Sequence, residues 1–295
     1  MELKDNINMR TENEMLDLIL NTAKENHRIR AVHMNGSRAN PNAPKDKYQD
    51  YDIVFRVTGT EWFLENPDWL SAFGELIMLQ EPDKNNAARG ESIDPGRYYA
   101  WLMLFKDGNR IDLTIETDCD DYGEDTLTVP LLDKDNILPQ IAPSSDVGYY
   151  VKRPTEGQYL SACNNFWWCL QNVAKGIARD ELTYAMNMYV QVVHEKLEDM
   201  VSWYIGVHNE FAVNVGMWGK YFKKYLPEEL YAMYKKTYSD ADYCNLWNAV
   251  FTACELFRII ATDVGVKLGY EYNMQDDANM TEYLRKVESE ACSQS

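Results

Sequence analysis

Three aspartates have the types and spacing to do chemistry in this chain: Asp50, Asp52 and Asp112. Asp50 and Asp52 lie two residues apart at the start of an apolar run that is typical of a β-strand, so their side chains point to the same face. Two carboxylates held that close repel each other unless a cation lies between them. A third carboxylate, from Asp112 on a neighbouring strand, would complete an oxygen-ligand site for Mg²⁺.

A glycine–serine turn precedes the acidic pair. Gly36-Ser37 follows an apolar run, and Ser37 stands thirteen residues before Asp50. The backbone N–H groups of such a turn can bind the oxygens of a triphosphate. Ser37 would donate to phosphate, and Arg38 would neutralise charge on a leaving pyrophosphate.

The joint pattern carries more weight than either motif alone. Forty-seven acidic residues make chance D-x-D pairs common, and a lone Gly-Ser is weaker still. Phosphoryl-group chemistry needs a metal, positioning and charge stabilisation. Asp50 and Asp52 would hold Mg²⁺, and Asp112 fits either as a shared ligand or as the base that takes the proton. The pattern therefore indicates attack on a nucleoside triphosphate.

The first half of the chain mixes helix and strand patterns that would position these residues. Thr11 and Glu14 form a capping box before a helix that extends to about Asn26. The other elements expected before residue 80 are strands at 29–35, 51–57 and 77–79 and a short helix at 69–73 capped by Asp68.

A polar segment and a hairpin complete this half. Residues 83–96 are polar and rich in Gly, Asn and Pro, which predicts a mobile loop. The β-rich runs 98–105 and 110–116 are joined through Asp107-Gly108, a strong hairpin signal. The hairpin would place Asp112 on a strand that could pair close to the acidic pair.

The pattern becomes almost wholly helical after residues 143–154. Apolar residues recur at helical spacing in three stretches, near 166–173, 182–197 and 251–264. The predicted fold is an α+β N-terminal domain over residues 1–150, a mixed sheet flanked by helices. An all-α helical-bundle domain over residues 151–295 follows it.

Net charge and composition indicate which kinds of binding partner and which cellular setting to expect. The net charge of −18 disfavours nucleic acid and favours a cationic small molecule, although acidity can serve solubility alone. The six cysteines include no C-x-x-C pair, and no run is apolar enough to span a membrane. The first ten residues carry no apolar signal region. A cytoplasmic protein with reduced cysteines is expected, with its oligomeric state open.

The chain resembles the aminoglycoside 6-adenylyltransferases (streptomycin adenylyltransferases) of the polymerase-β-like nucleotidyltransferase superfamily. The resemblance covers most of the chain and is carried by specific motifs, among them Gly36-Ser37-Arg38-Ala39-Asn40, Gln49-Asp50-Tyr51-Asp52-Ile53, Ile111-Asp112-Leu113-Thr114, Cys163-Asn164-Asn165-Phe166-Trp167 and Met200-Val201-Ser202-Trp203.

The resemblance implies an activity and a set of site residues. It implies transfer of AMP from Mg-ATP to a hydroxyl of an aminoglycoside such as streptomycin, with antibiotic resistance as the outcome. Asp50, Asp52 and Asp112 match the acidic triad of the family. Gly36, Ser37 and Arg38 match its nucleotide-contacting turn. The predicted domain at 1–150 is then a nucleotidyltransferase domain that binds ATP and Mg²⁺, and 151–295 would bind the acceptor.

Two residues depart from the family pattern. Asn165 stands where the pattern has Glu, and Asn187 stands where it has Asp. An amide neither pairs with a drug ammonium group nor accepts a proton as a carboxylate does, so the acceptor is the least determined part of the prediction. The residues expected to bind it are Asp180, Glu181, Glu195 and Trp167, and Lys220 is expected to reach an ATP phosphate.

Each of these residues also has a structural explanation. Aromatic residues at helical spacing more often belong to a core, acidic ones to a solvated helix face, and a basic patch to a surface. Two other functions remain open. One is a nucleotidyltransferase that acts on a different small-molecule or protein hydroxyl, and the other is a non-catalytic nucleotide- or drug-binding protein.

Overall fold

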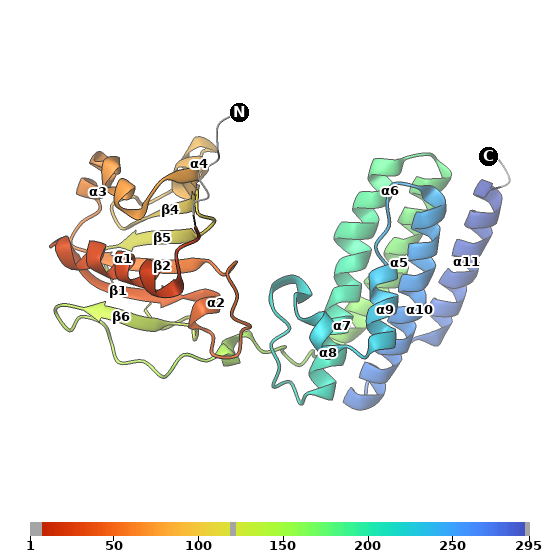
Figure 1. Ribbon diagram of the computed structural model, residues 1–295. Coiled ribbons are helices and arrows are strands. Elements are labelled where there is room, and N and C mark those ends of the chain that lie inside the picture. Colours follow the sequence, from red (N-terminus) through yellow and green to blue (C-terminus); the bar gives the residue numbers. More distant parts are fainter. Residues whose placement is uncertain (1–7, 119–121, 293–295) are drawn as a thin grey trace. The chain divides into compact units, whose positions relative to one another are not determined.

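A computed structural model describes residues 8–118 and 122–292 of the chain. The chain divides into two compact units, residues 1–148 and 149–295 (Figure 1). Each unit has a hydrophobic core of its own. The division lies close to the predicted boundary at residue 150.

The first unit is built on a six-stranded mixed sheet, which confirms that part of the prediction (Figure 1). The strand order is β3-β4-β5-β2-β1-β6, and β2 and β5 pair in parallel whereas the other neighbours are antiparallel. The strands are β1 (Ile29–Asn35), β2 (Tyr51–Val57), β3 (Leu76–Gln80), β4 (Tyr98–Phe105), β5 (Arg110–Glu116) and β6 (Val129–Asp133).

Burial along β5 follows the period of a strand with one covered face. Ile111, Leu113 and Ile115 are buried in the core, whereas Arg110 and Asp112 on the opposite face are half-buried. This alternation keeps the chemistry-bearing side chains of the strand away from the core. The strand therefore serves packing with one face and the site with the other.

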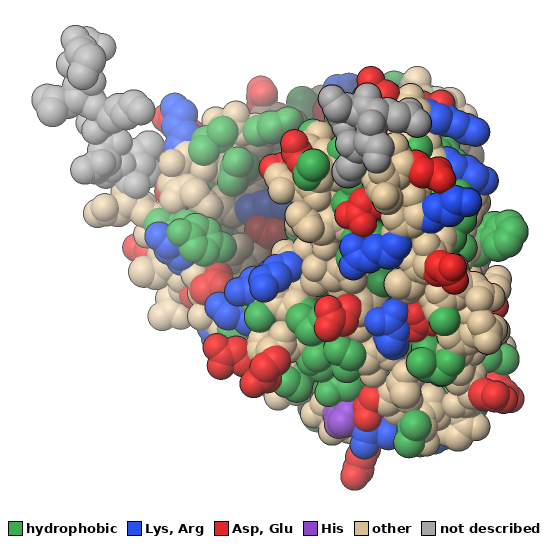
Figure 2. Space-filling model, turned by 90° about the vertical axis from the view of Figure 1, so that its right-hand side faces the viewer, with side chains coloured by type: hydrophobic (Ala, Val, Ile, Leu, Met, Phe, Trp, Pro, Cys, Tyr) green, Lys and Arg blue, Asp and Glu red, His purple; other side chains and the backbone are tan. Residues whose placement is uncertain are grey.

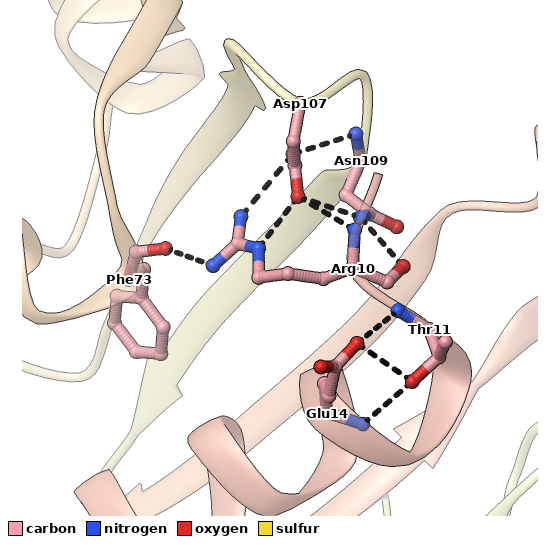
Figure 3. A network of polar contacts seen from close by, with 6 residues as sticks. All are labelled: Arg10, Thr11, Glu14, Phe73, Asp107 and Asn109. Carbon is pink, nitrogen blue, oxygen red and sulfur yellow. Dashed lines mark hydrogen bonds and ion pairs between the residues drawn. The ribbon is translucent and has the colours of Figure 1, made fainter. Parts of the chain in front are cut away.

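Helix α1 (Glu12–Glu25) begins at the expected capping box. The Thr11 side chain accepts a hydrogen bond from the Glu14 backbone N–H, and the Glu14 carboxylate accepts one from the Thr11 N–H (Figure 3). Met15, Ile19 and Ala23, at helical spacing, are fully buried and belong to the core of the sheet. The sequence prediction of this helix is confirmed.

Arg10, just before α1, fixes the turn of the β4–β5 hairpin (Figure 3). Its Nε donates to Asp107 Oδ2 over 2.6 Å, and its Nη1 donates to the Phe73 carbonyl over 2.6 Å. Burial tends to raise the pKa of Asp107, but hydrogen bonds from Arg10 and Asn109 hold it well below its ordinary value. The predicted Asp107-Gly108 turn is confirmed, with Gly108 at φ +88°.

The short helix expected at 69–73 is present as a 3-10 helix, η1 (Pro67–Phe73). Its expected cap was wrong, because Asp68 lies inside the helix. The prediction of a loop at 83–96 was also wrong in part, because this segment contains most of helix α4 (Pro82–Ala88). Asp83 is buried and accepts a hydrogen bond from the Ala100 N–H over 2.9 Å, which anchors this polar helix to β4. The remaining elements of this region are α2 (Gly36–Ala39), α3 (Glu61–Glu65) and η2 (Asp146–Tyr149).

The second unit is helical, as expected (Figure 1). Phe166 of α5 and Phe257 of α10 stack with ring centroids 3.8 Å apart at the centre of its core. The elements are α5 (Glu156–Ala178), α6 (Leu182–Met188), the π-helical turn η3 (Tyr189–Val193), α7 (His194–His208), η4 (Met217–Gly219), α8 (Phe222–Tyr225), α9 (Glu228–Lys236), α10 (Tyr243–Leu268) and α11 (Met274–Cys292).

The structure also shows the state of four cysteines and whether any described helix could span a membrane. Cys163, Cys169, Cys244 and Cys254 are free thiols, and Cys119 lies outside the described residues. Within 8–118 and 122–292, no helix is both long and apolar enough to cross a membrane.

Candidate active site

The sheet brings the three predicted aspartates to one place. Asp52 on β2 lies directly opposite Asp112 on the parallel strand β5, and Asp50 immediately precedes β2. The Arg110 guanidinium contacts two of the three carboxylates, donating to Asp112 over 2.7 and 2.6 Å and lying 3.3 Å from Asp50 Oδ2. The fold therefore places Asp52 and Asp112 on paired strands, with Asp50 one residue before β2.

The site carries more negative charge than its surroundings compensate. Burial and, to a smaller extent, the carboxylates of Asp112 and Asp50 together raise the pKa of Asp52 to about 6, although Arg110 opposes this increase. Burial also raises the pKa of Asp50; Arg110 opposes this increase and Asp112 adds to it. A nearby cation stabilises the ionised form of such carboxylates. The negative charge of the site is therefore suited to a divalent ion bound by oxygen ligands.

The carboxylates do not form a ready-made ligand set. Among the residues that the structure describes, no group of three or more His, Cys, Asp or Glu side chains is arranged to hold a metal ion. Both oxygens of Asp112 and one oxygen of Asp50 face the guanidinium nitrogens of Arg110. The assignment of Asp50, Asp52 and Asp112 as metal ligands stays a prediction.

The glycine of the Gly36-Ser37 turn is required by the close approach of Asp52. Gly36 opens α2 with φ +73°, a conformation that L-residues rarely adopt. A Cβ atom at this position would lie 2.1 Å from Asp52 Oδ2. The turn thus packs directly against the central aspartate of the site, and only glycine fits there.

Arg38 holds the loop around the site rather than pointing freely into it. Its Nη2 donates to the Gln49 carbonyl over 2.8 Å and its Nε to the Asp50 carbonyl over 3.1 Å. The guanidinium also lies 3.8 Å from the ring centre of Tyr51 and 3.5 Å from a Glu12 carboxylate oxygen, and the side chain is only 6% exposed. In this structure Arg38 positions the acidic segment, a role that sequence reasoning did not assign.

Gln49 is a second positioning residue that the sequence analysis missed. Its Nε2 donates to the Ser37 carbonyl over 3.2 Å and lies 3.4 Å from Ser37 Oγ. The signal for it was its place directly before the acidic pair. Together with Arg38, it ties the turn to the strand that carries Asp50 and Asp52.

The acceptor-binding residues predicted in the helical unit are not gathered in one cluster. Asp180, at φ +59°, accepts a hydrogen bond from the Tyr243 hydroxyl over 2.9 Å, and Glu181 precedes α6. Glu195 lies fourteen residues further along the α6–η3–α7 run, roughly 20 Å away at the rise of a helix. Glu195 pairs with Lys196 over 2.7 Å.

Two other predicted residues have mainly structural surroundings. Trp167 is 3% exposed within the core and donates to the Tyr272 hydroxyl over 3.0 Å. This burial is typical of a core residue, and the assignment of Trp167 as an acceptor contact stays a prediction. Lys220 follows η4, with its Nζ 5.2 Å from the Tyr221 ring centre.

A groove of about 610 Å³ lies between α5 and α7. It contains Asn165 together with Lys196 and Asp199, which form an ion pair over 3.0 Å. Lys196 went unnoticed in the sequence because it stands among acidic residues. The full lining is Thr155, Gly157, Gln158, Ser161, Ala162, Asn165, Lys196, Asp199 and Trp203.

Sequence comparison supplies the family. Residues 9–287 match the streptomycin adenylyltransferase family, a range that includes the acidic triad and the α5–α7 groove. The chain belongs to the streptomycin adenylyltransferase family. It is therefore an adenylyltransferase enzyme, and its family implies a nucleotide substrate.

Relatives of this family enzyme align over nearly its whole length. An aminoglycoside 6-adenylyltransferase of Bacillus subtilis (strain 168) is 36% identical over 283 residues, covering 95% of this chain and 98% of the relative. One of Campylobacter jejuni is 36% identical over 272 residues, covering 91% and 93%. A crystal structure of an aminoglycoside 6-adenyltransferase from Bacillus subtilis matches at 32% identity with a TM-score of 0.46, covering 95% of this chain and 99% of that one.

Proposed function

We propose that this enzyme transfers AMP from Mg-ATP to a hydroxyl of an aminoglycoside such as streptomycin and releases pyrophosphate. The observation that carries the proposal is the pairing of Asp52 opposite Asp112, with the Gly36 turn packed against Asp52. The relatives named aminoglycoside 6-adenylyltransferase support the acceptor class. The need for ATP points to the cytoplasm as the place of the reaction.

The chain's own residues would act by holding charge and geometry. Asp50, Asp52 and Asp112 would hold Mg²⁺, which when bound neutralises their charge and that of the triphosphate. The acceptor oxygen forms a bond to the α-phosphorus while the bond to the pyrophosphate oxygen breaks, and the acceptor proton passes to a base. Asp112 has two open roles, as the third ligand or as that base.

The turn beside the triad would orient the triphosphate. Ser37 and the backbone of Gly36-Ser37 are the proposed phosphate contacts. Arg38 and Gln49 support them, because both side chains hold the turn and the acidic segment against each other. Lys220 is retained as a proposed contact to an ATP phosphate.

The helical unit is the proposed binding region for the acceptor. Its α5–α7 groove offers amide, hydroxyl and carboxylate groups suited to an aminosugar. Asp180, Glu181 and Glu195 remain proposed contacts for ammonium groups. On the face shown in Figure 2, basic side chains lie among acidic ones, so the attraction of a cation there depends on local groups rather than on one uniform field.

A second candidate function is adenylylation of a different hydroxyl. The groove contains Asn165, where the resemblance to the family implies Glu, and the Lys196 ammonium group pairs with Asp199 as well as with Glu195. Such a groove has less negative charge to offer a polycation than one with a free carboxylate. This favours an acceptor with fewer positive charges near the groove.

A panel of acceptors tests both candidates. The enzyme is incubated with ATP, MgCl₂ and streptomycin, other aminoglycosides, or neutral sugars, with mass spectrometry of the acceptor and a pyrophosphate assay. Gain of one AMP unit by streptomycin supports the proposal, and gain only by other acceptors supports the second candidate. Failure of every acceptor to release pyrophosphate, in conditions where nucleotide binds, would contradict the proposed catalysis.

A further inference from the structure

Arg110 makes an unusual set of contacts at the acidic triad. Its Nε and Nη2 donate to the two oxygens of Asp112 over 2.7 and 2.6 Å, and its Nη1 lies 3.3 Å from Asp50 Oδ2. A guanidinium fork matches a carboxylate in this bidentate geometry, which is one of the stronger charge-assisted contacts in proteins. One arginine, with a single positive charge, thus contacts two of the three carboxylates.

The strand dictates this contact. Arg110 and Asp112 lie two residues apart on β5, so both side chains project from the same face of the sheet. Asp112 in turn lies opposite Asp52 on β2. The Arg110 side chain is 40% exposed, so it can leave the carboxylates without unpacking the core.

We propose that Arg110 is a resident counter-cation that holds Asp50 and Asp112 in the metal-free enzyme and competes with a divalent cation for them. The inference rests on the proposed function, since it takes these carboxylates as metal ligands. The same oxygen lone pairs cannot serve both a guanidinium and a metal ion. A metal ion that takes the lone pairs facing the guanidinium must therefore displace Arg110 from them.

This competition has a measurable consequence for affinity. When only a fraction of molecules is in the binding-competent state, the apparent dissociation constant rises by the inverse of that fraction. If Arg110 occupies the carboxylates in about nine molecules of ten, its removal tightens metal binding by roughly tenfold. Until a divalent cation binds, Arg110 also occupies the carboxylate oxygens that other cations in solution would otherwise contact.

The test is titration of the full chain with MnCl₂, without nucleotide, at pH 7.5 and low salt, with free Mn²⁺ measured by electron paramagnetic resonance. The variants are Arg110→Gln, which removes the charge, and Arg110→Lys, which keeps the charge but loses the fork. Arg30→Gln is the matched control, because Arg30 also forms a two-pronged ion pair, with Asp135, on the described surface of the same unit. Asp52→Asn reports whether the bound Mn²⁺ is at the triad.

The expected result is a dissociation constant about tenfold lower for Arg110→Gln, an intermediate value for Arg110→Lys and no change for Arg30→Gln. Circular dichroism melting should show the metal-free Arg110→Gln protein folded, with a larger gain in melting temperature on adding MnCl₂ than the wild type. Equal affinities for wild type and Arg110→Gln, with binding lost in Asp52→Asn, would overturn the inference alone. Mn²⁺ binding that Asp52→Asn leaves unchanged, or no binding by any variant, would overturn the proposed metal site as well.

Discussion

The acidic site on the sheet and the groove of the helical unit differ in how basic side chains compensate their carboxylates. At the site, Arg110 contacts two of the three carboxylates, and burial and like charges raise the pKa of Asp52 to about 6. At the groove, the one ammonium group of Lys196 pairs with Asp199, which lines the groove, and with Glu195, so a single lysine compensates part of the charge of two carboxylates. Under the proposed function, the first region would receive a divalent cation, and the second would bind the acceptor through amide, hydroxyl and carboxylate groups.

This difference separates the two halves of the proposed reaction. Nucleotide chemistry depends on charge that the protein leaves uncompensated, and such charge lowers the stability of the fold until a cation arrives. Acceptor choice is proposed to depend on the polar groups of the groove, where Lys196 compensates part of the negative charge. Changes at the triad should therefore affect catalysis and metal-free stability in opposite directions, whereas changes in the groove should affect acceptor recognition alone.

Asp52→Asn should have the largest effect, because it removes a partly buried charge of the acidic site. Turnover should fall by at least ~10³-fold because a metal ligand is lost. The metal-free variant should melt at a higher temperature than the wild type, because the buried charge is removed. Rates of AMP transfer and calorimetry measure the two effects. Asp135→Asn, at the exposed ion pair with Arg30, is the control, and normal turnover by Asp52→Asn would refute the site assignment.

Gly36→Ala should reduce turnover by about 100-fold and lower the free energy of unfolding by about 3 kcal/mol. The added methyl group meets Asp52 Oδ2 at 2.1 Å, and φ is +73°. Gly90→Ala is a matched control, since Gly90 has φ +82° but nothing within 4 Å of a new Cβ. It should lose about 1 kcal/mol and keep full activity. Equal kinetics for the two variants would show that contact with Asp52 is irrelevant.

The pH dependence of stability should reveal the same uncompensated charge. The folded-state pKa of Asp52 is raised from 3.8 to about 6, so the folded protein binds this proton more tightly than the unfolded chain does. Its contribution is therefore favourable at low pH and is lost as the pH rises from about 4 to about 6, by about 2 kcal/mol. Urea unfolding of the metal-free wild type and Asp52→Asn across this range measures it. Parallel curves for the two proteins would exclude Asp52 as the source.

Asn165→Glu should have the smallest effect, and this effect should be confined to binding of the acceptor. A carboxylate added to the groove should lower the KM for streptomycin by about fivefold and leave the KM for ATP unchanged. Asn248→Asp, which adds a charge on the exposed face of α10, serves as the control. An equal change in the KM for streptomycin in both variants would indicate general steering by charge rather than binding in the groove.

The strands and the meeting of the aspartates could be predicted because they follow from local rules. Alternation around Asp112, the capping box at Thr11 and the Asp107-Gly108 turn each specify their own element. The parallel pairing of β2 and β5 then decides which side chains meet. The helix at Pro82–Ala88 could not be predicted in this way. Its Asp83 accepts a hydrogen bond from the N–H of Ala100, a contact that local sequence does not reveal.

The roles of individual side chains were harder to predict than their positions. Arg38 beside a phosphate-binding turn suggests a ligand contact, yet it binds backbone carbonyls that only the returning loop supplies. Trp167 lies in the core because the partners of its helix, far along the chain, cover it. Charge type and spacing indicate which chemistry is available, whereas side-chain direction depends on contacts that are distant in sequence.

The most direct test of the account is a crystal structure of the enzyme with MnCl₂ and a non-hydrolysable ATP analogue, using the anomalous signal of manganese to place the ion. The account predicts a manganese peak within about 2.1–2.3 Å of oxygens from Asp50, Asp52 and Asp112, with Arg110 released from Asp112. A manganese peak bound only elsewhere, with Arg110 still paired to Asp112, would contradict it.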